Sequence, residues 1–160
     1  MTMNLDQQIQ ALIQEAPKDG STGAAVEAIA PALKSLAAQL QHLQYYILQT
    51  LDQGWVMTTV ANRNQADLRK NVIYAYPTLQ DVALGPQSIK DPQVMALPIP
   101  VTQILFRMLS MRSVDSVIFF ENPGSLRRAV EVRRQDIQTI LQAQLQQAVQ
   151  KANNVPPDIA

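Results

Sequence analysis

The stretch that decides the fold is Val114-Asp115-Ser116-Val117-Ile118-Phe119-Phe120-Glu121, followed by Asn122-Pro123-Gly124-Ser125. Residues 117–120 are four consecutive apolar residues, two β-branched and two aromatic, which leave neither face of a strand for water. We therefore expect a central strand with packed layers on both sides. In the segment after it, proline presets φ for the second turn position and glycine accepts a positive φ at the third. This pattern predicts a type II turn.

Length and composition narrow the classes of protein. A chain of 160 residues favours one domain, which can bury a core without disulfides or metals. Hydrophobic residues make up 47% and charged residues only 16%, so much of the polar surface must come from glutamine. Thirteen basic and thirteen acidic residues cancel, which argues against long-range steering toward nucleic acid or an anionic membrane. The absence of cysteine excludes thiolate nucleophiles and Cys-ligated metal sites.

The amino terminus has neither the basic segment nor the apolar segment of a secretory signal. No run approaches the roughly 18 apolar residues that a membrane-spanning helix needs. We therefore expect a cytoplasmic protein without a transmembrane segment.

Helical spacing marks two amino-terminal helices. The first covers residues 4–16, ends at 17–20, and carries an apolar stripe of Leu5, Ile9, Leu12 and Ile13. This stripe can dock on its own domain, serve a partner or a second copy, or contribute to both. The second helix covers residues 21–41, with a cap at Ser21 or Thr22. Pro31 lies inside it and predicts a kink or two helical pieces.

From Tyr45 the apolar period changes to two. Residues 45–51 and 55–60 predict two strands joined by Asp52-Gln53-Gly54, a hairpin loop with Gly54 in the left-handed conformation. Residues 71–76 predict a third strand, so that the three form an antiparallel meander. Thr78 and Asp81 then predict a capping box for a short helix that ends at Gly85-Pro86.

The rest of the chain surrounds the central strand. Residues 86–98 predict a proline-punctuated loop, and the next residues a helix with Val101, Ile104 and Leu105 on one face. This helix is long enough to be a crossover, which favours parallel pairing of the third and central strands. Residues 129–132 predict a short edge strand, and a long helix follows from Arg134.

Together these segments predict an α+β fold: an antiparallel three-stranded meander, a crossover helix, a central strand, and terminal helices packed on the sheet. We expect an amino-terminal amphipathic helix over residues 1–20, a single α+β domain over residues 21–152, and a loose tail over residues 153–160.

The order of features over residues 45–150 resembles that of the SseB-like family of bacterial proteins. The resemblance rests on residues 72–81, the apolar entry to the helix at residue 97, the strand ending in Asn122-Pro123-Gly124, the short strand at residue 130, and the closing helix. The two amino-terminal helices depart from that pattern. The glutamine-rich composition is also similar to that of cyanobacterial proteins of unknown function. The resemblance implies a small mixed domain without known catalytic residues, and it transfers no site.

Catalytic chemistry has little support in the sequence. His42 is the only imidazole and has no carboxylate at helical spacing, so we expect it to end a helix. Asp115 and Glu121 flank the central strand, about 20 Å apart by strand rise. There is no phosphate-binding glycine motif. We therefore predict no catalytic residue, no cofactor and no metal site, and a hydrolase with dispersed carboxylates ranks last among the functions considered.

The function that we expect is non-enzymatic protein–protein interaction, as an adaptor or accessory subunit that binds another protein or forms a homodimer. The alternative is RNA or other nucleic-acid binding, in which an arginine cluster lies at the edge of a sheet that exposes tyrosines. We favour the first because the net charge is zero and the tyrosines lack the spacing of RNA-binding motifs. The interaction candidates are Leu5, Ile9, Leu12, Ile13, Arg127, Arg128, Arg133 and Arg134.

Overall fold

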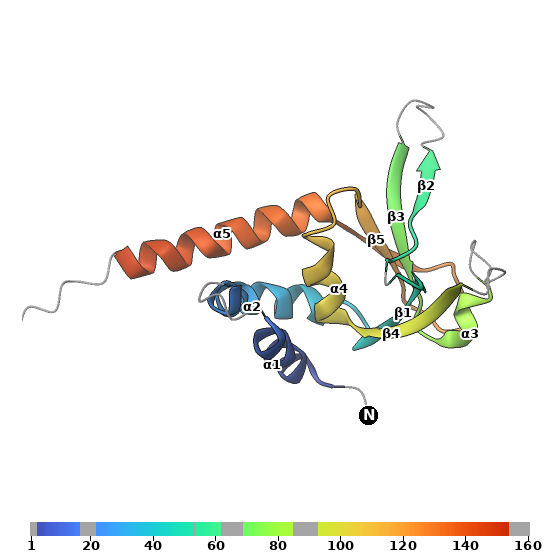
Figure 1. Ribbon diagram of the computed structural model, residues 1–160, viewed down its shortest axis with the longest axis horizontal. Helices are drawn as coiled ribbons and strands as arrows, with labels where there is room; N and C mark the ends of the chain where they lie inside the picture. The colour runs from blue at the N-terminus through green and yellow to red at the C-terminus, as the bar shows by residue number, and fades with distance from the viewer. Residues whose placement is uncertain (1–2, 17–21, 53, 62–68, 85–92, 154–160) are drawn as a thin grey trace, which may run out of the picture.

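The computed structural model describes residues 3–16, 22–52, 54–61, 69–84 and 93–153 (Figure 1). Its elements, in chain order, are α1 (Leu5–Glu15), α2 (Thr22–Ala38), β1 (Gln44–Thr50), β2 (Thr58–Ala61), β3 (Arg69–Ala75), α3 (Leu79–Val82), β4 (Val94–Pro100), α4 (Val101–Met108), β5 (Ser116–Phe120), β6 (Ala129–Arg133) and α5 (Arg134–Asn153). The mixed α+β class expected from the sequence is confirmed.

The strands form a four-stranded sheet of order β2-β3-β5-β6 and a two-stranded sheet of β1 and β4. β3 and β5 are parallel, and every other pair is antiparallel. The predicted parallel pairing across the crossover is therefore confirmed, as are the central place of β5 and the edge position of β6. Tyr76, the residue after β3, joins the two sheets. Its backbone exchanges hydrogen bonds of 2.7 and 3.0 Å with the backbone of Tyr46 in β1.

The predicted three-stranded meander is wrong, because its first strand, β1, does not lie in the same sheet as β2 and β3. β1 pairs along all seven residues with β4, which comes from the segment predicted as a loop. Only an isolated bridge, between Gln49 and Trp55, links β1 to the segment before β2. Tyr46 directs its backbone groups to Tyr76, so its β4 partner Pro98 occupies a position whose N–H would face the outer edge. Proline is tolerated at such edge positions, so the prolines that predicted a loop are compatible with a strand here.

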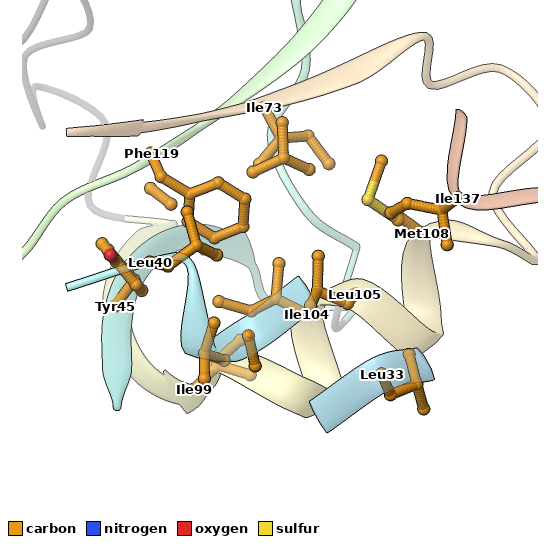
Figure 2. Packing of buried hydrophobic residues seen from close by; sticks show 14 of the residues in the cluster. Leu33, Leu40, Tyr45, Ile73, Ile99, Ile104, Leu105, Met108, Phe119 and Ile137 are labelled. Carbon is orange, nitrogen blue, oxygen red and sulfur yellow. The ribbon is translucent and has the colours of Figure 1, made fainter. Parts of the chain in front are cut away.

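The main core lies between the four-stranded sheet and the helices (Figure 2). Val117 and Phe119 of β5 are fully buried in it, together with Leu33 of α2, Leu105 of α4 and Ile137 of α5. A second cluster, which contains Phe120, Tyr76, Leu48 and Val82, packs on the other face. Both faces of β5 are therefore covered, as the sequence predicts.

Four of the five described helices, α1, α2, α4 and α5, lie on one side of the sheet, and Val82 of α3 belongs to the cluster on the other face. α5 packs on α2, and α1 packs mainly on α2 and α4 rather than on the sheet itself. α2 is a single helix that contains Pro31, so the alternative of two helical pieces is wrong. The predicted end of the first helix at residues 17–20, the cap Ser21 and residues 154–160 of the predicted tail lie outside the described residues.

The turn after β5 and the short helix α3 are held by one carboxylate. Gly124 has φ of 82°, and the Ser125 N–H donates to the Asn122 carbonyl (3.1 Å), as expected for the predicted type II turn. Thr78 caps α3, but the side chain of Asp81 accepts from the Thr78 hydroxyl (2.6 Å) and from the Gly124 N–H (2.7 Å). The predicted capping box is therefore only half formed, because the buried Asp81 carboxylate binds the Thr78 hydroxyl and a turn 43 residues away instead of the Thr78 N–H.

Two local expectations have other outcomes. Gly54 does not have a positive φ, so its predicted left-handed conformation is wrong. α3 is one turn long, and Gly85-Pro86, the predicted end of that helix, lies outside the described residues.

Phe119→Asp should unfold the domain. The substitution places an unpaired charge among fully buried side chains, which costs several kcal/mol out of a total stability of about 5–15 kcal/mol. Ile140→Asp is the matched control, because Ile140 retains 42% of its surface on α5. Circular dichroism melts should show no cooperative transition for the first variant and a near-native one for the second. A native-like melt of Phe119→Asp would mean that β5 is not central.

Candidate functional site

β6 is an edge strand with one unpaired side. It pairs with β5, and no described strand lies beyond it. Four of its five residues are exposed, and the apolar Val130 retains 40% of its surface. An exposed edge of this kind is a template for an added strand.

The direction of the backbone groups follows from the ends of the β5–β6 ladder. The Glu121 N–H donates to the Arg128 carbonyl (3.1 Å), and the Arg134 N–H donates to the Asp115 carbonyl (2.8 Å). Because bonding alternates along an antiparallel pair, every second residue between these ends faces β5. The residues whose N–H and C=O groups point to the free edge are Ala129, Glu131 and Arg133.

The four predicted arginines lie in two pairs, one at each end of β6. Arg128 and Arg133 are about 17 Å apart by strand rise. Arg127 and Arg128 are exposed, and their guanidinium groups have no hydrogen bond or ion pair with any residue that the structure describes. Arg134, in contrast, donates to the carbonyls of Met108 and Leu109 at the end of α4. The free positive charge is therefore concentrated at the start of β6.

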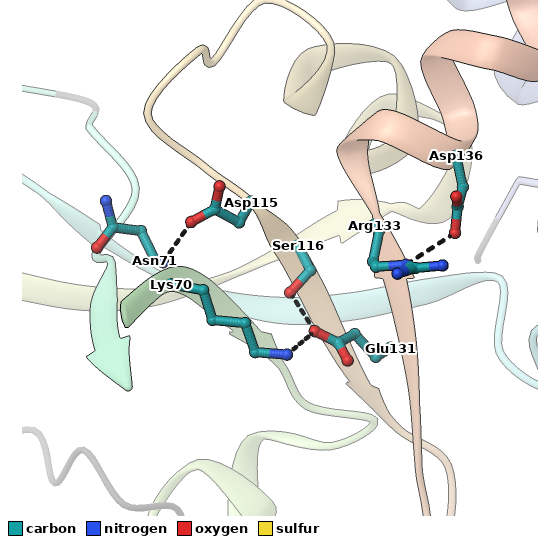
Figure 3. A network of polar contacts seen from close by, with 7 residues as sticks. All are labelled: Lys70, Asn71, Asp115, Ser116, Glu131, Arg133 and Asp136. Atoms are coloured by element: carbon teal, nitrogen blue, oxygen red, sulfur yellow. Dashed lines mark hydrogen bonds and ion pairs between the residues drawn. The ribbon is translucent and has the colours of Figure 1, made fainter. Parts of the chain in front are cut away.

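The middle of β6 carries a small polar network (Figure 3). The Glu131 carboxylate forms an ion pair with Lys70 and accepts from the Ser116 hydroxyl (2.7 Å). Burial acts to raise the pKa of Glu131, but the bonds from Lys70 and Ser116 and the charges of Lys70 and Arg133 outweigh it, so that this pKa lies below its usual value. At the far end, Arg133 Nε lies 3.0 Å from Asp136 Oδ2. The only carboxylate on β6 is thus neutralised within the domain.

The apolar stripe of α1 faces inward. Ile9 is buried in the main core, and Leu5, Leu12 and Ile13 pack against it. Gln8, which the sequence analysis did not single out, is 1% exposed. Its Nε2 donates to the Leu43 carbonyl (2.8 Å), and its Oε1 accepts from the Thr102 amide (3.1 Å) and hydroxyl (2.8 Å). In this structure the stripe is docked on its own domain.

A buried polar junction forms where α2, β1 and β5 meet. Glu121 Oε2 accepts from the Tyr45 hydroxyl (2.8 Å) and the Gln41 N–H (3.3 Å), and His42 Nε2 lies 2.6 Å from the Glu121 carbonyl. Burial, and the carboxylate that accepts its hydrogen bond, raise the pKa of Tyr45 well above its usual value. Sequence reasoning missed this junction, because the residues are about 80 positions apart and no spacing signal connects them. Its bonds tie three chain segments together.

The tyrosines do not form an exposed stacking platform. Tyr45 and Tyr76 are fully buried, and Tyr46 and Tyr74 are half-buried. Tyr74 and Tyr76 stack on Phe120, with ring centroids 5.8 and 5.3 Å away. Their rings therefore cover the second face of β5.

A shallow depression of about 520 Å³ lies between the segment before β2 and the loop before β5. Trp55, Met57, Ile73 and Met111 give it an apolar wall. The Arg107 guanidinium lies 4.4 Å from the centre of the Trp55 ring, outside the set of residues that line the depression. Arg112, Ser110 and Ser113 also lie along the lining, and Arg112 is the one charged residue among the described residues that form it.

Two other features are absent from the described ranges, a metal-binding cluster and a membrane-spanning helix. No group of three or more His, Asp or Glu residues there could hold a metal ion. None of the helices in those ranges combines the length and the apolar composition needed to cross a bilayer.

The sequence matches no protein-family model, and the curated proteins contain no significant match to it. The resemblance to the SseB-like family therefore stays a prediction from the order of sequence features.

Gln8→Ala should lower the free energy of unfolding by about 2–3 kcal/mol, because it leaves the buried amide and hydroxyl of Thr102 without their acceptor. Gln10→Ala, at an exposed position of α1, should change it by less than about 0.5 kcal/mol. Urea denaturation measures both values. Equal stability of the two variants would mean that α1 is not docked on its domain in solution.

Tyr76→Phe should leave stability at neutral pH unchanged or slightly higher, because the buried Tyr76 hydroxyl has no partner among the described residues. Burial, with a contribution from Tyr74, raises the pKa of Tyr76 from 10.0 to about 12. Ionisation of this hydroxyl is therefore disfavoured in the folded protein, so Tyr76 leaves the stability independent of pH below pH 10 and lowers it as the pH rises from 10 to about 12.

Urea denaturation at neutral pH and between pH 10 and 12 should show a shallower alkaline decline for this variant than for the wild type. An identical decline in both proteins would mean that the pKa of Tyr76 is not raised by burial in the fold.

Proposed function

We propose that this chain is a non-enzymatic protein-interaction module, an adaptor or accessory subunit, whose partner adds an extended segment to the free edge of β6. The observation that carries the proposal is the outward backbone of Ala129, Glu131 and Arg133, which no described element covers. In strand addition, backbone hydrogen bonds supply affinity and the alternate side chains supply selectivity.

A comparison of two edges supports this choice. β4 carries Pro98 and Pro100 at alternate positions, which removes outward donors from the edge of the two-stranded sheet. β6 has no proline, and the charge of Glu131 is bound by Lys70. Natural proteins protect edge strands with prolines or unpaired charges. Residues 129–133 thus have neither protection, and the unpaired charges of Arg127 and Arg128 lie just before the strand, so β6 itself is suited to a partner.

The docked position of α1 also favours β6 over α1 as the interaction surface. Its stripe, the first candidate from the sequence, is packed against the core and offers little surface to a second protein. The buried acids support the non-enzymatic part of the proposal. Asp81 binds the turn at Gly124, and Glu121 binds Tyr45 and the end of α2. Each of them connects chain segments rather than facing a cleft.

Nucleic-acid binding is the second candidate, and the exposed pair Arg127 and Arg128 is the observation that favours it. Phosphate contacts by these residues would weaken steeply with salt. Titration of labelled RNA at two salt concentrations, with wild type and with Arg127→Ser/Arg128→Ser, tests this candidate directly.

Affinity capture from native lysate tests the proposed function. The baits are wild type, Ala129→Pro and Ala129→Ser, each with and without nuclease. Proline removes one outward N–H and leaves the bonds to β5 intact, whereas serine keeps that N–H. We expect a partner that wild type and Ala129→Ser retain, that Ala129→Pro loses, and that nuclease does not release. Partners retained equally by all three baits would contradict use of this edge.

A further inference from the structure

We infer that the segment accepted by β6 is acidic, with carboxylates at the end that lies beside Arg127 and Arg128. This inference rests on the proposed function, because it names the partner chemistry of the same edge. It follows from the charges around β6 and from the poorer fit of two other occupants, a second copy of this chain and a nucleic acid.

The charge at the edge is positive and uneven. Arg127 and Arg128 are exposed beside the first outward residue, Ala129, and they have no acidic partner in the described part of the chain. At the other end, Asp136 offsets Arg133. The Glu131 carboxylate in the middle is bound by Lys70 and Ser116. An added strand thus meets uncompensated positive charge at one end, where aspartate or glutamate gains most.

A second copy of this chain fits the edge poorly. Full antiparallel pairing of β6 with itself is centred on Glu131, so the two Glu131 residues would be opposite each other. The same register places Arg128 of each copy opposite Arg134 of the other. Like charges directly across a strand pair are destabilising. A shift toward the carboxyl terminus would bring the start of α5 into the ladder and shorten it, and a shift toward the amino terminus that pairs Ala129 with Glu131 would place Arg127 opposite Arg133.

A nucleic acid also matches only part of the surface. The free edge presents carbonyl acceptors as well as N–H donors, and a phosphate backbone offers acceptors alone. The exposed Val130 adds an apolar contact in the middle of the strand. A peptide backbone supplies both donors and acceptors, together with an apolar side chain at the right spacing.

The test uses synthetic peptides with the full-length protein. The probe is Asp-Asp-Thr-Val-Thr-Val-Thr-Asp-Asp, labelled with a fluorophore, and the controls replace every Asp with Asn or with Lys. Fluorescence anisotropy at low and at physiological ionic strength gives the dissociation constants. We expect the Asp peptide to bind at least about tenfold more tightly than the Asn peptide at low ionic strength, and the Lys peptide to bind most weakly.

Three variants assign the effect to residues. Arg127→Ser/Arg128→Ser should remove most of the preference for Asp over Asn, whereas Arg112→Ser, an exposed arginine outside β6, should keep it. Ala129→Pro should weaken every peptide by about tenfold through the loss of an outward donor, and Ala129→Ser should not. Thermal melts confirm that each variant is folded. The charge variants test the inference independently of the proline.

The other outcomes separate the two proposals. Equal binding of the three peptides, sensitive to Ala129→Pro, would overturn the acidic preference and leave edge binding in place. A concentration-dependent dimer that Ala129→Pro dissociates would assign the edge to a second copy. Oligouridine that binds more tightly than the Asp peptide and needs Arg127 and Arg128 would assign it to nucleic acid. No measurable binding of any peptide would overturn both the inference and the use of this edge.

Discussion

Residues 117–120 can be buried only if both faces of β5 are covered and both of its edges are paired, and this requirement places most of the other elements. β3 supplies one edge in parallel and β6 supplies the other in antiparallel orientation. A parallel pair needs a long connection, which here contains β4 and α4. The helices then cover one face of β5, and the aromatic cluster around Tyr76 covers the other. Among the described strands, β6 is the neighbour of β5 that keeps an open side.

Two buried carboxylates hold the end of β5 in place. Asp81 reaches the turn at Gly124, and Glu121 reaches Tyr45 and the backbone after α2. Glu121 accepts from the buried Tyr45 hydroxyl, which would otherwise have lost its partner in the interior, and Asp81 accepts from the part-buried Thr78 hydroxyl and Gly124 N–H. The region around the strand end is thus fixed by polar contacts as well as by packing. This rigidity supports a β6 edge with a defined direction.

Sequence reasoning found the elements whose signals are local. The apolar run of β5, the Asn122-Pro123-Gly124 turn and the cap at Thr78 are each set by neighbouring residues. β4 was missed because its prolines mark a loop in isolation, and only the pairing of Tyr46 with Tyr76 shows that they face an edge. The roles of Gln8 and Glu121 depend on partners far away in the chain, so no spacing could reveal them. The sequence indicated that the four arginines lie on the surface. Their separation into two pairs at the ends of β6 became clear only from the pairing of β6 with β5.

The bond between Gln8 and Thr102 has a consequence for biosynthesis, since it joins residues 94 positions apart. During synthesis α1 is made long before α4, yet the Thr102 donors that Gln8 binds are not available until α4 has left the ribosome. β5, the strand on which the core depends, appears later still and needs β6 as its second neighbour. Until α4 has been made, α2 alone among the helices that pack on α1 can cover its apolar stripe. Exposed apolar segments of this kind are what chaperones bind, so efficient production of this domain should depend on them more than its modest size suggests.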